Sequence, residues 1–223
     1  ALRVSDQVFD NTEHEERLKA YLHSLEPERS LLLTELREYA AVNDVPIVRK
    51  ETESFLRTMS AMQKPKRILE IGTAIAYSTI VFAQSCEADI LTVESYEKRI
   101  PIARANIKRA GLEHRIRLIE GDAGKVLKEL DKSFDLVFLD AAKAQYIVWL
   151  PDILRLMHEG SVLLADNVLQ DHTLIESRFA VPRRERTTHE RMREFLWQIK
   201  HDESLETSVI PLGDGVSLSV KKS

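Results

Sequence analysis

Cysteine and long apolar runs are almost absent from the sequence. The single cysteine, Cys86, cannot form an internal disulfide framework and offers no paired thiols for a structural zinc, which fits a reducing compartment. No apolar run approaches the length of a membrane span, and residues 1–11 lack the charged-then-apolar layout of a secretory signal. These absences predict a cytoplasmic protein that is not exported and has no membrane partner.

An excess of positive charge is absent as well. The 32 Lys and Arg residues are outnumbered by 36 Asp and Glu residues, which gives a formal net charge of -4. This balance excludes the overall positive field of a protein that coats nucleic acid without specificity, so a basic surface must be local. The sequence shows no repeat, low-complexity tract or linker, and 223 residues suit one domain. We therefore predict a single domain over residues 1–223.

Residues 1–64 carry apolar side chains at helical spacing. The pattern covers residues 13–26 and 28–42, and a third amphipathic stretch follows a break at residues 43–46 and ends at residues 64–66. This part of the chain is expected to be a helical region that precedes an α/β core at residues 65–223. One face of the first helix gathers four apolar side chains, namely Leu18, Tyr21, Leu22 and Leu25.

The core region alternates strand-length apolar runs with helix-like segments. Several runs are continuously apolar, as in parallel strands that are covered by helices on both faces. The last two runs, 208–210 and 216–220, flank a Gly-containing turn with no helix between them, which predicts an antiparallel hairpin. We predict an α/β, Rossmann-like fold with a seven-stranded, mostly parallel sheet, a C-terminal antiparallel hairpin and extra N-terminal helices. The five preceding runs are 67–71, 89–93, 115–119, 134–139 and 161–165.

Small and acidic residues follow successive strands at the edge where parallel sheets bind ligands. The loop at residues 70–78 has one glycine, Gly72, which excludes the three-glycine dinucleotide fingerprint and the Gly-Lys-Ser/Thr phosphate loop. A nucleoside without phosphates fits better. Glu94 is placed to accept from ribose hydroxyls, and Asp122, in Gly-Asp-Ala, from an adenine amino group. Each feature alone is equally consistent with a turn or a helix cap, but three at successive strand ends favour a cofactor.

A second group of polar residues follows the fourth and fifth strands. Asp140 and Lys143 lie in Asp-Ala-Ala-Lys, and Asp166 and Asn167 follow the next strand. Two carboxylates and an amide oxygen suit a hard divalent cation such as Mg²⁺ or Mn²⁺. The alternative is that both aspartates cap helices and that Lys143 pairs with them. The seven histidines have no ligand-like spacing, so none is assigned to a metal.

These motifs resemble the metal-dependent O-methyltransferases related to catechol and caffeoyl-coenzyme A O-methyltransferases, and within them the bacterial tRNA 5-hydroxyuridine methyltransferases. The resemblance covers nearly the whole chain and implies a fold that binds S-adenosylmethionine (SAM). The sequence departs from the family at Ala76, where a second glycine is usual. The extra methyl group is expected at worst to reduce the affinity for the cofactor. The motifs that carry the resemblance are Val45-Pro46-Ile47, residues 70–75, residues 140–143, Asp166-Asn167-Val168-Leu169 and Gly213-Asp214-Gly215.

The resemblance also implies roles for individual residues. Lys143 is the general base, and Asp140, Asp166 and Asn167 hold the metal. The cofactor site is assigned Val45, Glu70, Gly72, Tyr77, Ser78, Glu94, Asp122, Ala123 and Asp140.

The implied reaction is methylation of 5-hydroxyuridine at the tRNA wobble position to 5-methoxyuridine by a homodimer. The alternative acceptor is a small catechol or caffeoyl-coenzyme A-like molecule, and a non-catalytic nucleoside- or RNA-binding module is the more distant alternative. A basic stretch at residues 182–193 predicts contact with the anticodon loop through Arg183, Arg184 and Arg186, unless it is only a solvated helix face. Tyr146 and Trp149 offer either stacking faces or core packing.

Overall fold

The computed structural model describes residues 11–170 and 173–223, and the chain forms two units, residues 1–30 and 31–223. In the first unit, helix α1 covers Asn11–Ser24, two residues earlier at each end than predicted. The predicted apolar face of α1 is exposed: Leu18, Tyr21, Leu22 and Leu25 have between 46% and 61% of their surface accessible. The helix therefore has an apolar stripe and no core of its own.

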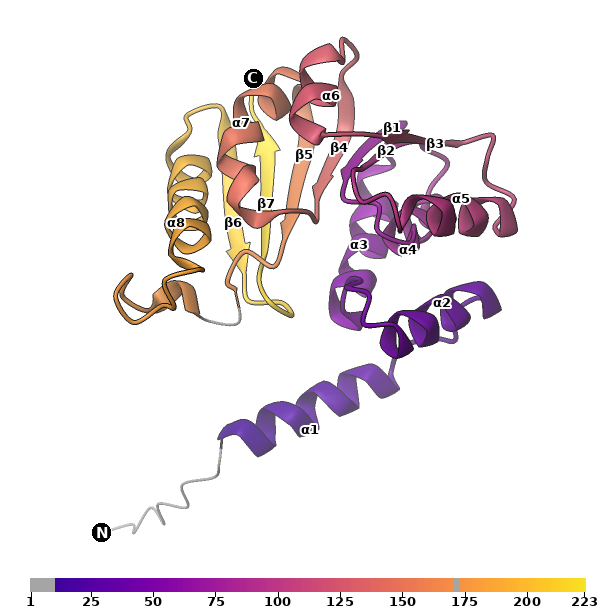
Figure 1. Ribbon diagram of the computed structural model, residues 1–223, viewed down its shortest axis with the longest axis horizontal. Helices are drawn as coiled ribbons and strands as arrows, with labels where there is room; N and C mark the ends of the chain where they lie inside the picture. The colour runs from indigo at the N-terminus through magenta and orange to yellow at the C-terminus, as the bar shows by residue number, and fades with distance from the viewer. Residues whose placement is uncertain (1–10, 171–172) are drawn as a thin grey trace. The chain divides into compact units, whose positions relative to one another are not determined.

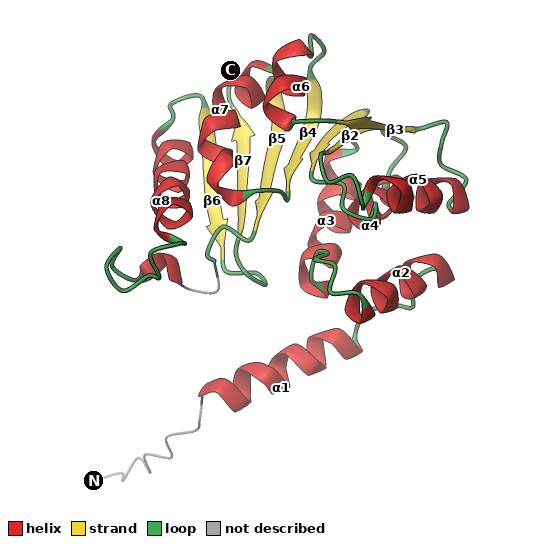
Figure 2. Ribbon diagram, in the orientation of Figure 1, coloured by secondary structure: helices red, strands yellow, loops and turns green. Residues whose placement is uncertain are grey.

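The second unit contains two helices followed by alternating strands and helices (Figures 1 and 2). No helix in the described part of the chain is both long and apolar enough to span a bilayer. The elements are α2 Leu31–Val42, α3 Lys50–Gln63, β1 Arg67–Ile71, α4 Tyr77–Ser85, β2 Asp89–Glu94, α5 Ile100–Arg109, β3 Ile116–Glu120, α6 Ala123–Glu129, β4 Phe134–Leu139, η1 Lys143–Gln145, α7 Tyr146–Arg155, β5 Met157–Asp166, η2 Thr173–Ile175, α8 Arg186–His201, β6 Leu205–Ile210 and β7 Val216–Lys221.

The strands form one seven-stranded sheet in the order β3-β2-β1-β4-β5-β7-β6. Strands β1 to β5 are parallel, and β7 runs antiparallel to both β5 and β6. This arrangement confirms the predicted mostly parallel sheet with its C-terminal hairpin. Two strands begin earlier than predicted. β6 begins at Leu205, not at Ser208. β5 begins at Met157, not at Ser161, because the exposed residues 158–160 interrupt the apolar run while the strand continues through them.

Two hydrophobic cores lie on the two faces of the sheet. Ile68 belongs to the core formed with α2, α3, α4 and α5, whereas its neighbour Leu69 belongs to the core formed with α6, α7 and α8. Such alternation follows from the two-residue period of a strand. Helices α2 and α3 share a core with the sheet, since Leu36 and Leu56 pack in the same cluster as Ile68. Residues 31–64 therefore take part in the packing of the α/β core.

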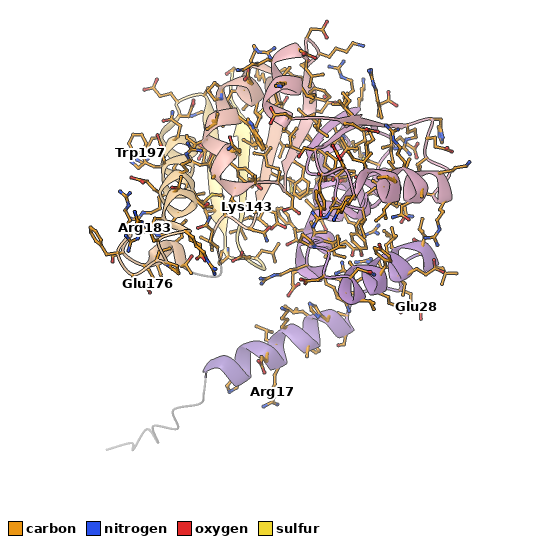
Figure 3. The ribbon with its side chains drawn as sticks, in the orientation of Figure 1. Arg17, Glu28, Lys143, Glu176, Arg183 and Trp197 are labelled. Carbon is orange, nitrogen blue, oxygen red and sulfur yellow. The ribbon has the colours of Figure 1, made fainter. Side chains whose placement is uncertain are left out.

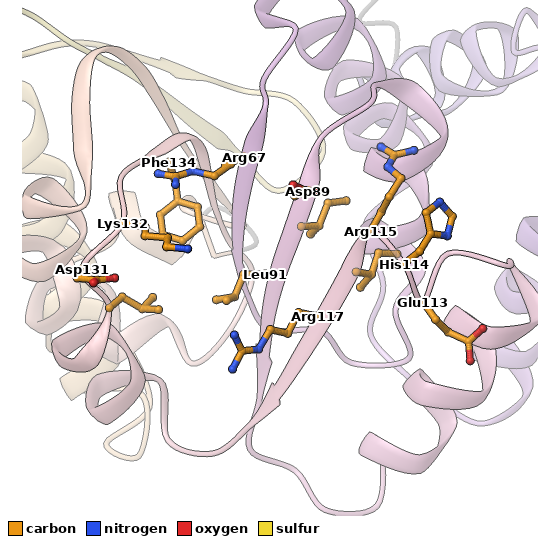
Figure 4. Close-up of a pocket in the computed structure, with 13 residues that line it drawn as sticks. Arg67, Asp89, Leu91, Glu113, His114, Arg115, Arg117, Asp131, Lys132 and Phe134 are labelled. Carbon is orange, nitrogen blue, oxygen red and sulfur yellow. The ribbon is translucent and has the colours of Figure 1, made fainter.

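A hollow of about 430 Å³ lies at the amino-terminal ends of β1, β2 and β3 (Figure 4). Arg67, Phe134 and Lys132 lie on one side of it, and Glu113 and His114 on the other. It is at the opposite end of the strands from the acidic and small residues singled out in the sequence. The predicted site residues do not line it, so it supplies distant control positions for the tests below.

Candidate active site

A second cavity of about 430 Å³ lies at the carboxyl ends of the parallel strands. Four of the residues that the sequence assigns to a cofactor line it together: Gly72, Glu94, Asp122 and Ala123. They come from loops after three different strands, and the parallel register of β1, β2 and β3 brings those loops to one edge. The prediction missed further lining residues from the region after β4, which are Ala141, Ala142, Gln145, Val148, Trp149 and Asp152.

Gly72 brings the loop after β1 into contact with the end of β4. Its φ of +105° is a conformation that residues with a side chain rarely adopt, and a Cβ there would lie 2.0 Å from the carbonyl oxygen of Asp140. The backbone N–H of Asp140 donates to the carbonyl of Ile71 at 3.0 Å. Gly72 therefore contacts both the cavity and the backbone of Asp140.

Glu94 is held in place by backbone donors. Its carboxylate accepts from the N–H of Ala74 at 2.7 Å, of Ser95 at 2.9 Å and of Tyr96 at 2.8 Å. A carboxylate has about four acceptor positions, so capacity remains for a ligand hydroxyl. The carboxylate at the end of β2 is thus oriented before a ligand binds.

Asp122 performs the helix-cap role that the sequence left open. Its side chain accepts from the N–H of Lys125 at 3.0 Å and so caps the beginning of α6. The same side chain also lines the cavity. Capping and ligand contact are compatible, because the cap uses one of its two oxygens.

Glu70 and Ser78 lie beneath the loop. Glu70 is fully buried and accepts from the hydroxyls of Ser78 at 2.6 Å, Thr92 at 2.6 Å and Thr79. Burial raises the pKa of Glu70 to about 7, although its hydrogen bonds act in the opposite direction. This geometry gives Glu70 the role of holding the loop and the start of α4.

Replacing Glu70 with glutamine is expected to remove a pH dependence of stability. The folded pKa of about 7 exceeds the ordinary value of 4.5, so between these values the folded state holds a proton that the unfolded chain has lost. The stability that this group contributes is complete below pH 4.5 and falls by about 3 kcal/mol as the pH rises through 7. Denaturant unfolding at pH 5 and pH 8 measures this. Equal pH dependence in Glu70→Gln and the original protein would contradict it.

Two other predicted cofactor residues do not line the cavity. Tyr77 is 2% exposed, and its hydroxyl is hydrogen-bonded to Glu53 and Arg37. Val45 is half-buried and packs against the core of α2 to α5.

Four predicted site residues lie near one another after β4 and β5. They are Asp140, Lys143, Asp166 and Asn167. The Nζ of Lys143 donates to Oδ1 of Asp140 at 2.9 Å and to the hydroxyl of Tyr146 at 3.0 Å. Asp166 is 1% exposed, and both burial and the charge of Asp140 raise its pKa to about 7. Asn167 has a left-handed φ of 56° and donates its N–H to Asp166 at 2.8 Å. The 3-10 helix η1 begins after Ala142 without a side-chain cap, so helix capping does not account for Asp140.

This donor set fits a divalent cation. Two carboxylates that repel each other in a buried place are stabilised by a positive charge between them, and the Asn167 amide adds a neutral oxygen donor. Within the described residues, no group of three or more His, Cys, Asp or Glu side chains is arranged to hold a metal. A cation at this place would therefore depend on amide, water or substrate oxygens beside the two carboxylates, as hard cations do.

The turn between β6 and β7 adds a third carboxylate that the sequence did not assign a role. Asp214 is 7% exposed, and its charge contributes to the raised pKa of Asp166. The carbonyls of Asp214 and Gly215 accept from the N–H groups of Leu169 and Val168, each at 3.0 Å. An acid between two glycines in a predicted turn was the available signal, but the sequence alone does not place that turn against the loop after β5.

Comparison with known proteins identifies the family. A family model described as O-methyltransferase matches residues 23–222. The chain belongs to the O-methyltransferase family. Tapetum-specific methyltransferase 1 of Arabidopsis thaliana is 29% identical over 91% of this chain and 92% of its own length. The catechol O-methyltransferase of Niastella koreensis is 28% identical over 80% of this chain and 82% of its own length.

Solved structures of relatives identify the cosubstrate of this O-methyltransferase. An SAH-bound methyltransferase from Podospora anserina has a TM-score of 0.85 and 28% identity, covering 96% of this chain and 97% of its own. An O-methyltransferase from Bacillus cereus in complex with SAH has a TM-score of 0.82 and 26% identity, covering 92% and 97%. The protein is a SAM-dependent O-methyltransferase of the catechol and caffeoyl-coenzyme A type with the predicted Rossmann-like methyltransferase fold.

The structure of this O-methyltransferase also places the residues predicted to contact RNA. Arg183 and Arg184 are exposed in the segment before α8, near its beginning (Figure 3), and Arg184 pairs with Glu185 at 3.1 Å. Arg186 instead donates to the carbonyl of Val181 at 3.1 Å, so part of its capacity serves the fold. Tyr146 is fully buried, which supports the core-packing alternative for that residue.

Proposed function

We propose that this enzyme uses a divalent cation to methylate a hydroxyl that neighbours a second oxygen, and that the hydroxyl is that of 5-hydroxyuridine in the tRNA anticodon loop. The observation that carries the proposal is the Asp140, Asp166, Asn167 and Lys143 group, which one backbone contact at Gly72 joins to the cavity. The product is 5-methoxyuridine. The whole chain, residues 1–223, is proposed to act as one catalytic domain.

The side chains divide the work between holding and proton transfer. Asp140, Asp166 and Asn167 would hold Mg²⁺ or Mn²⁺, which when bound lowers the pKa of a hydroxyl and fixes its angle. SAM supplies the methyl group. Lys143 would take the hydroxyl proton onto its Nζ as the bond between the methyl carbon and the sulfur of SAM breaks, the oxygen gains the methyl group and SAH is released.

The contacts of Lys143 with Asp140 and Tyr146 favour its charged form. Burial disfavours that form, but Tyr146 and Asp140 outweigh burial and raise the pKa of Lys143 above its usual range. A general base must first lose this proton. Any positive charge that neutralises Asp140 removes one of the groups that keep Lys143 protonated, so the base and the carboxylate are coupled through their 2.9 Å contact.

A basic and aromatic surface on the segment before α8 supports an RNA acceptor. Phe179 is 84% exposed, and the Arg186 guanidinium lies 6.0 Å from its ring centroid. Arg183 and Arg184 follow in the same segment. On α8, Arg191 donates to the carbonyl of Ala144 at 3.2 Å, which ties this helix to the 3-10 helix that begins with Lys143. Arginines for phosphates and an exposed aromatic ring for an unpaired base are the features of single-stranded RNA recognition.

A small aromatic acceptor is the second candidate, because curated relatives are named catechol and caffeoyl-coenzyme A O-methyltransferases. Catechol has two adjacent hydroxyls, and 5-hydroxyuracil has a hydroxyl next to a carbonyl, so one arrangement of oxygen ligands serves both.

We also propose a homodimer, to which the exposed apolar stripe of α1 lends support. The mass of the protein in solution tests it, and a monomer at all concentrations would refute it.

The test measures methyl transfer from labelled SAM to tRNA with wobble 5-hydroxyuridine and to catechol, each with Mg²⁺ and with EDTA. We expect metal-dependent labelling of the tRNA at far lower acceptor concentration. The double variant Arg183→Ala, Arg184→Ala should raise the KM for tRNA about tenfold at low salt and reduce its salt dependence, because two phosphate contacts are lost. Its KM for catechol should not change.

The matched control for this variant is Arg104→Ala. Arg104 is also an exposed, ion-paired arginine, and its partner Glu120 belongs to β3, the edge strand at the opposite side of the sheet from β6. Preference for catechol in the original protein, or an equal effect of Arg104→Ala on tRNA, would move the acceptor to small molecules. Labelling that persists in EDTA would refute the role of the metal.

A further inference from the structure

A buried charged cluster joins α2 and α3 to the beginning of α4. Glu53 on α3 is 1% exposed, and its Oε2 accepts from the Tyr77 hydroxyl at 2.6 Å and from Arg37 Nη2 at 2.9 Å. Its Oε1 accepts from Arg57 Nε at 3.0 Å. The Arg37 guanidinium also lies 4.7 Å from the centroid of the Tyr77 ring. Tyr77 is therefore held both at its hydroxyl and at its ring face.

Arg37 contacts Tyr77, which the sequence assigned to the cofactor, and Val48, three residues after the assigned Val45. Its Nε and Nη2 donate to the Tyr77 hydroxyl at 3.1 and 2.9 Å, and Tyr77 ends the loop that begins at Gly72. Its Nη2 also donates to the carbonyl of Val48 at 3.3 Å, directly after Val45-Pro46-Ile47. One side chain thus fixes the distance between the loop after β1 and the segment before α3.

The loop that ends at Tyr77 needs such support. Ala74 and Ala76 have φ angles of 47° and 68°, in the left-handed region that favours glycine. Residues in such conformations persist where their surroundings hold them. Glu94 holds the N–H of Ala74, and Asn106 donates to the carbonyl of Ile75 at 3.0 Å. Tyr77 is the next fixed point along the chain.

We propose that Arg37 and Glu53 are positioning residues for SAM: through Tyr77 and Val48 they set the shape of the loop at residues 72–78. Neither is assigned a contact with the reacting atoms. A buried carboxylate with two guanidinium partners stabilises a fold no better than apolar side chains of the same volume do, so its place at this loop calls for a functional reason. The inference rests on the proposed assignment of the loop to the cofactor.

The test is the affinity for SAM, measured by calorimetry without acceptor or metal. Arg37→Gln and Glu53→Gln should each raise the Kd of SAM on the order of tenfold or more, because small displacements of a binding loop are costly. In assays, the KM for SAM should rise while kcat at saturating SAM and the KM of the acceptor stay unchanged. A merely structural role would instead lower the active fraction and leave both KM values unchanged.

Arg57→Gln is the matched control. Arg57 donates to the same Glu53 carboxylate and to Ser85, on the side of Glu53 away from the Tyr77 contact. We expect lower thermal stability with an unchanged Kd of SAM. An equal rise of this Kd in Arg57→Gln and Arg37→Gln would overturn the proposal, as would an unchanged Kd in Arg37→Gln.

Two further variants separate this proposal from the assignments beneath it. As a single variant, Tyr77→Phe should raise the Kd of SAM. Added to Glu53→Gln, it should cause no further rise of this Kd, since the two groups act through one hydrogen bond. It also keeps the test open if Glu53→Gln does not fold. Gly72→Ala should weaken SAM binding strongly; normal binding there would overturn the loop assignment and this proposal together. A wrong acceptor assignment leaves these binding measurements untouched.

Discussion

Replacing Asp140 with alanine is expected to reduce methyl transfer by about 10³-fold or more while SAM still binds. A cation that neutralises developing charge is worth several kcal/mol, and each 1.4 kcal/mol corresponds to a factor of about ten in rate. Asp140 lies at the end of β4, beside the buried Asp166, and its oxygen is the one that Lys143 contacts. Its loss removes a proposed metal ligand and the ionic partner of the proposed base.

The measurement combines initial rates over a range of Mg²⁺ concentrations with calorimetry of SAM binding in EDTA. Asp131→Ala is the control, because Asp131 is an exposed acid at the hollow on the other end of the strands (Figure 4). It should leave rate, metal dependence and SAM affinity unchanged. Full activity of Asp140→Ala in chelator-treated buffer would refute the metal assignment.

The sheet was predictable where the strands are covered by helices on both faces. The runs at residues 67–71 and 134–139 match β1 and β4 to the residue, and all positions of these strands except Arg67 and Asp135 are buried. Amphipathic helices gave less. The sequence shows an apolar stripe on α1, but such a pattern does not indicate which surface packs against it. In the structure the three apolar side chains of the stripe on α1, and Leu25 directly after the helix, are exposed.

Some of the site residues were predictable because strand order alone brings them together, whereas others meet only through the packing of distant helices. Gly72, Glu94 and Asp122 meet at one cavity because strand order and direction alone bring their loops to the same edge. The contacts of Arg37 with Tyr77 span 40 positions and arise from the packing of α2 and α3 on α4. On the sequence, Arg37 and Glu53 look like ordinary charges on exposed helix faces, so no local pattern predicts their pairing.

The pKa values of the site residues were the least predictable property from the sequence. The pKa of the proposed base, Lys143, is raised in the structure, since Tyr146 and Asp140 both lie within hydrogen-bond distance, and no local sequence pattern predicts these contacts. A depressed pKa would have required burial without such partners. The fully buried Tyr146, whose hydroxyl donates to the carbonyl of Leu139 at 3.0 Å, thereby becomes part of the environment of the base.

Replacing Lys143 with methionine is expected to lower kcat between about 10²- and 10⁴-fold, the range that a general base contributes. The neutral form of Lys143 accepts the proton, so the rate of the original protein should rise with pH as Lys143 loses its proton. In Lys143→Met this rise should be lost, while the KM for SAM and the response to Mg²⁺ are preserved. Lys132→Met, at an exposed lysine of the distant hollow, is the matched control and should keep both kcat and its pH dependence. A kcat for Lys143→Met close to that of the original protein would show that the proton leaves by another route, with Lys143 serving only as the ionic partner of Asp140.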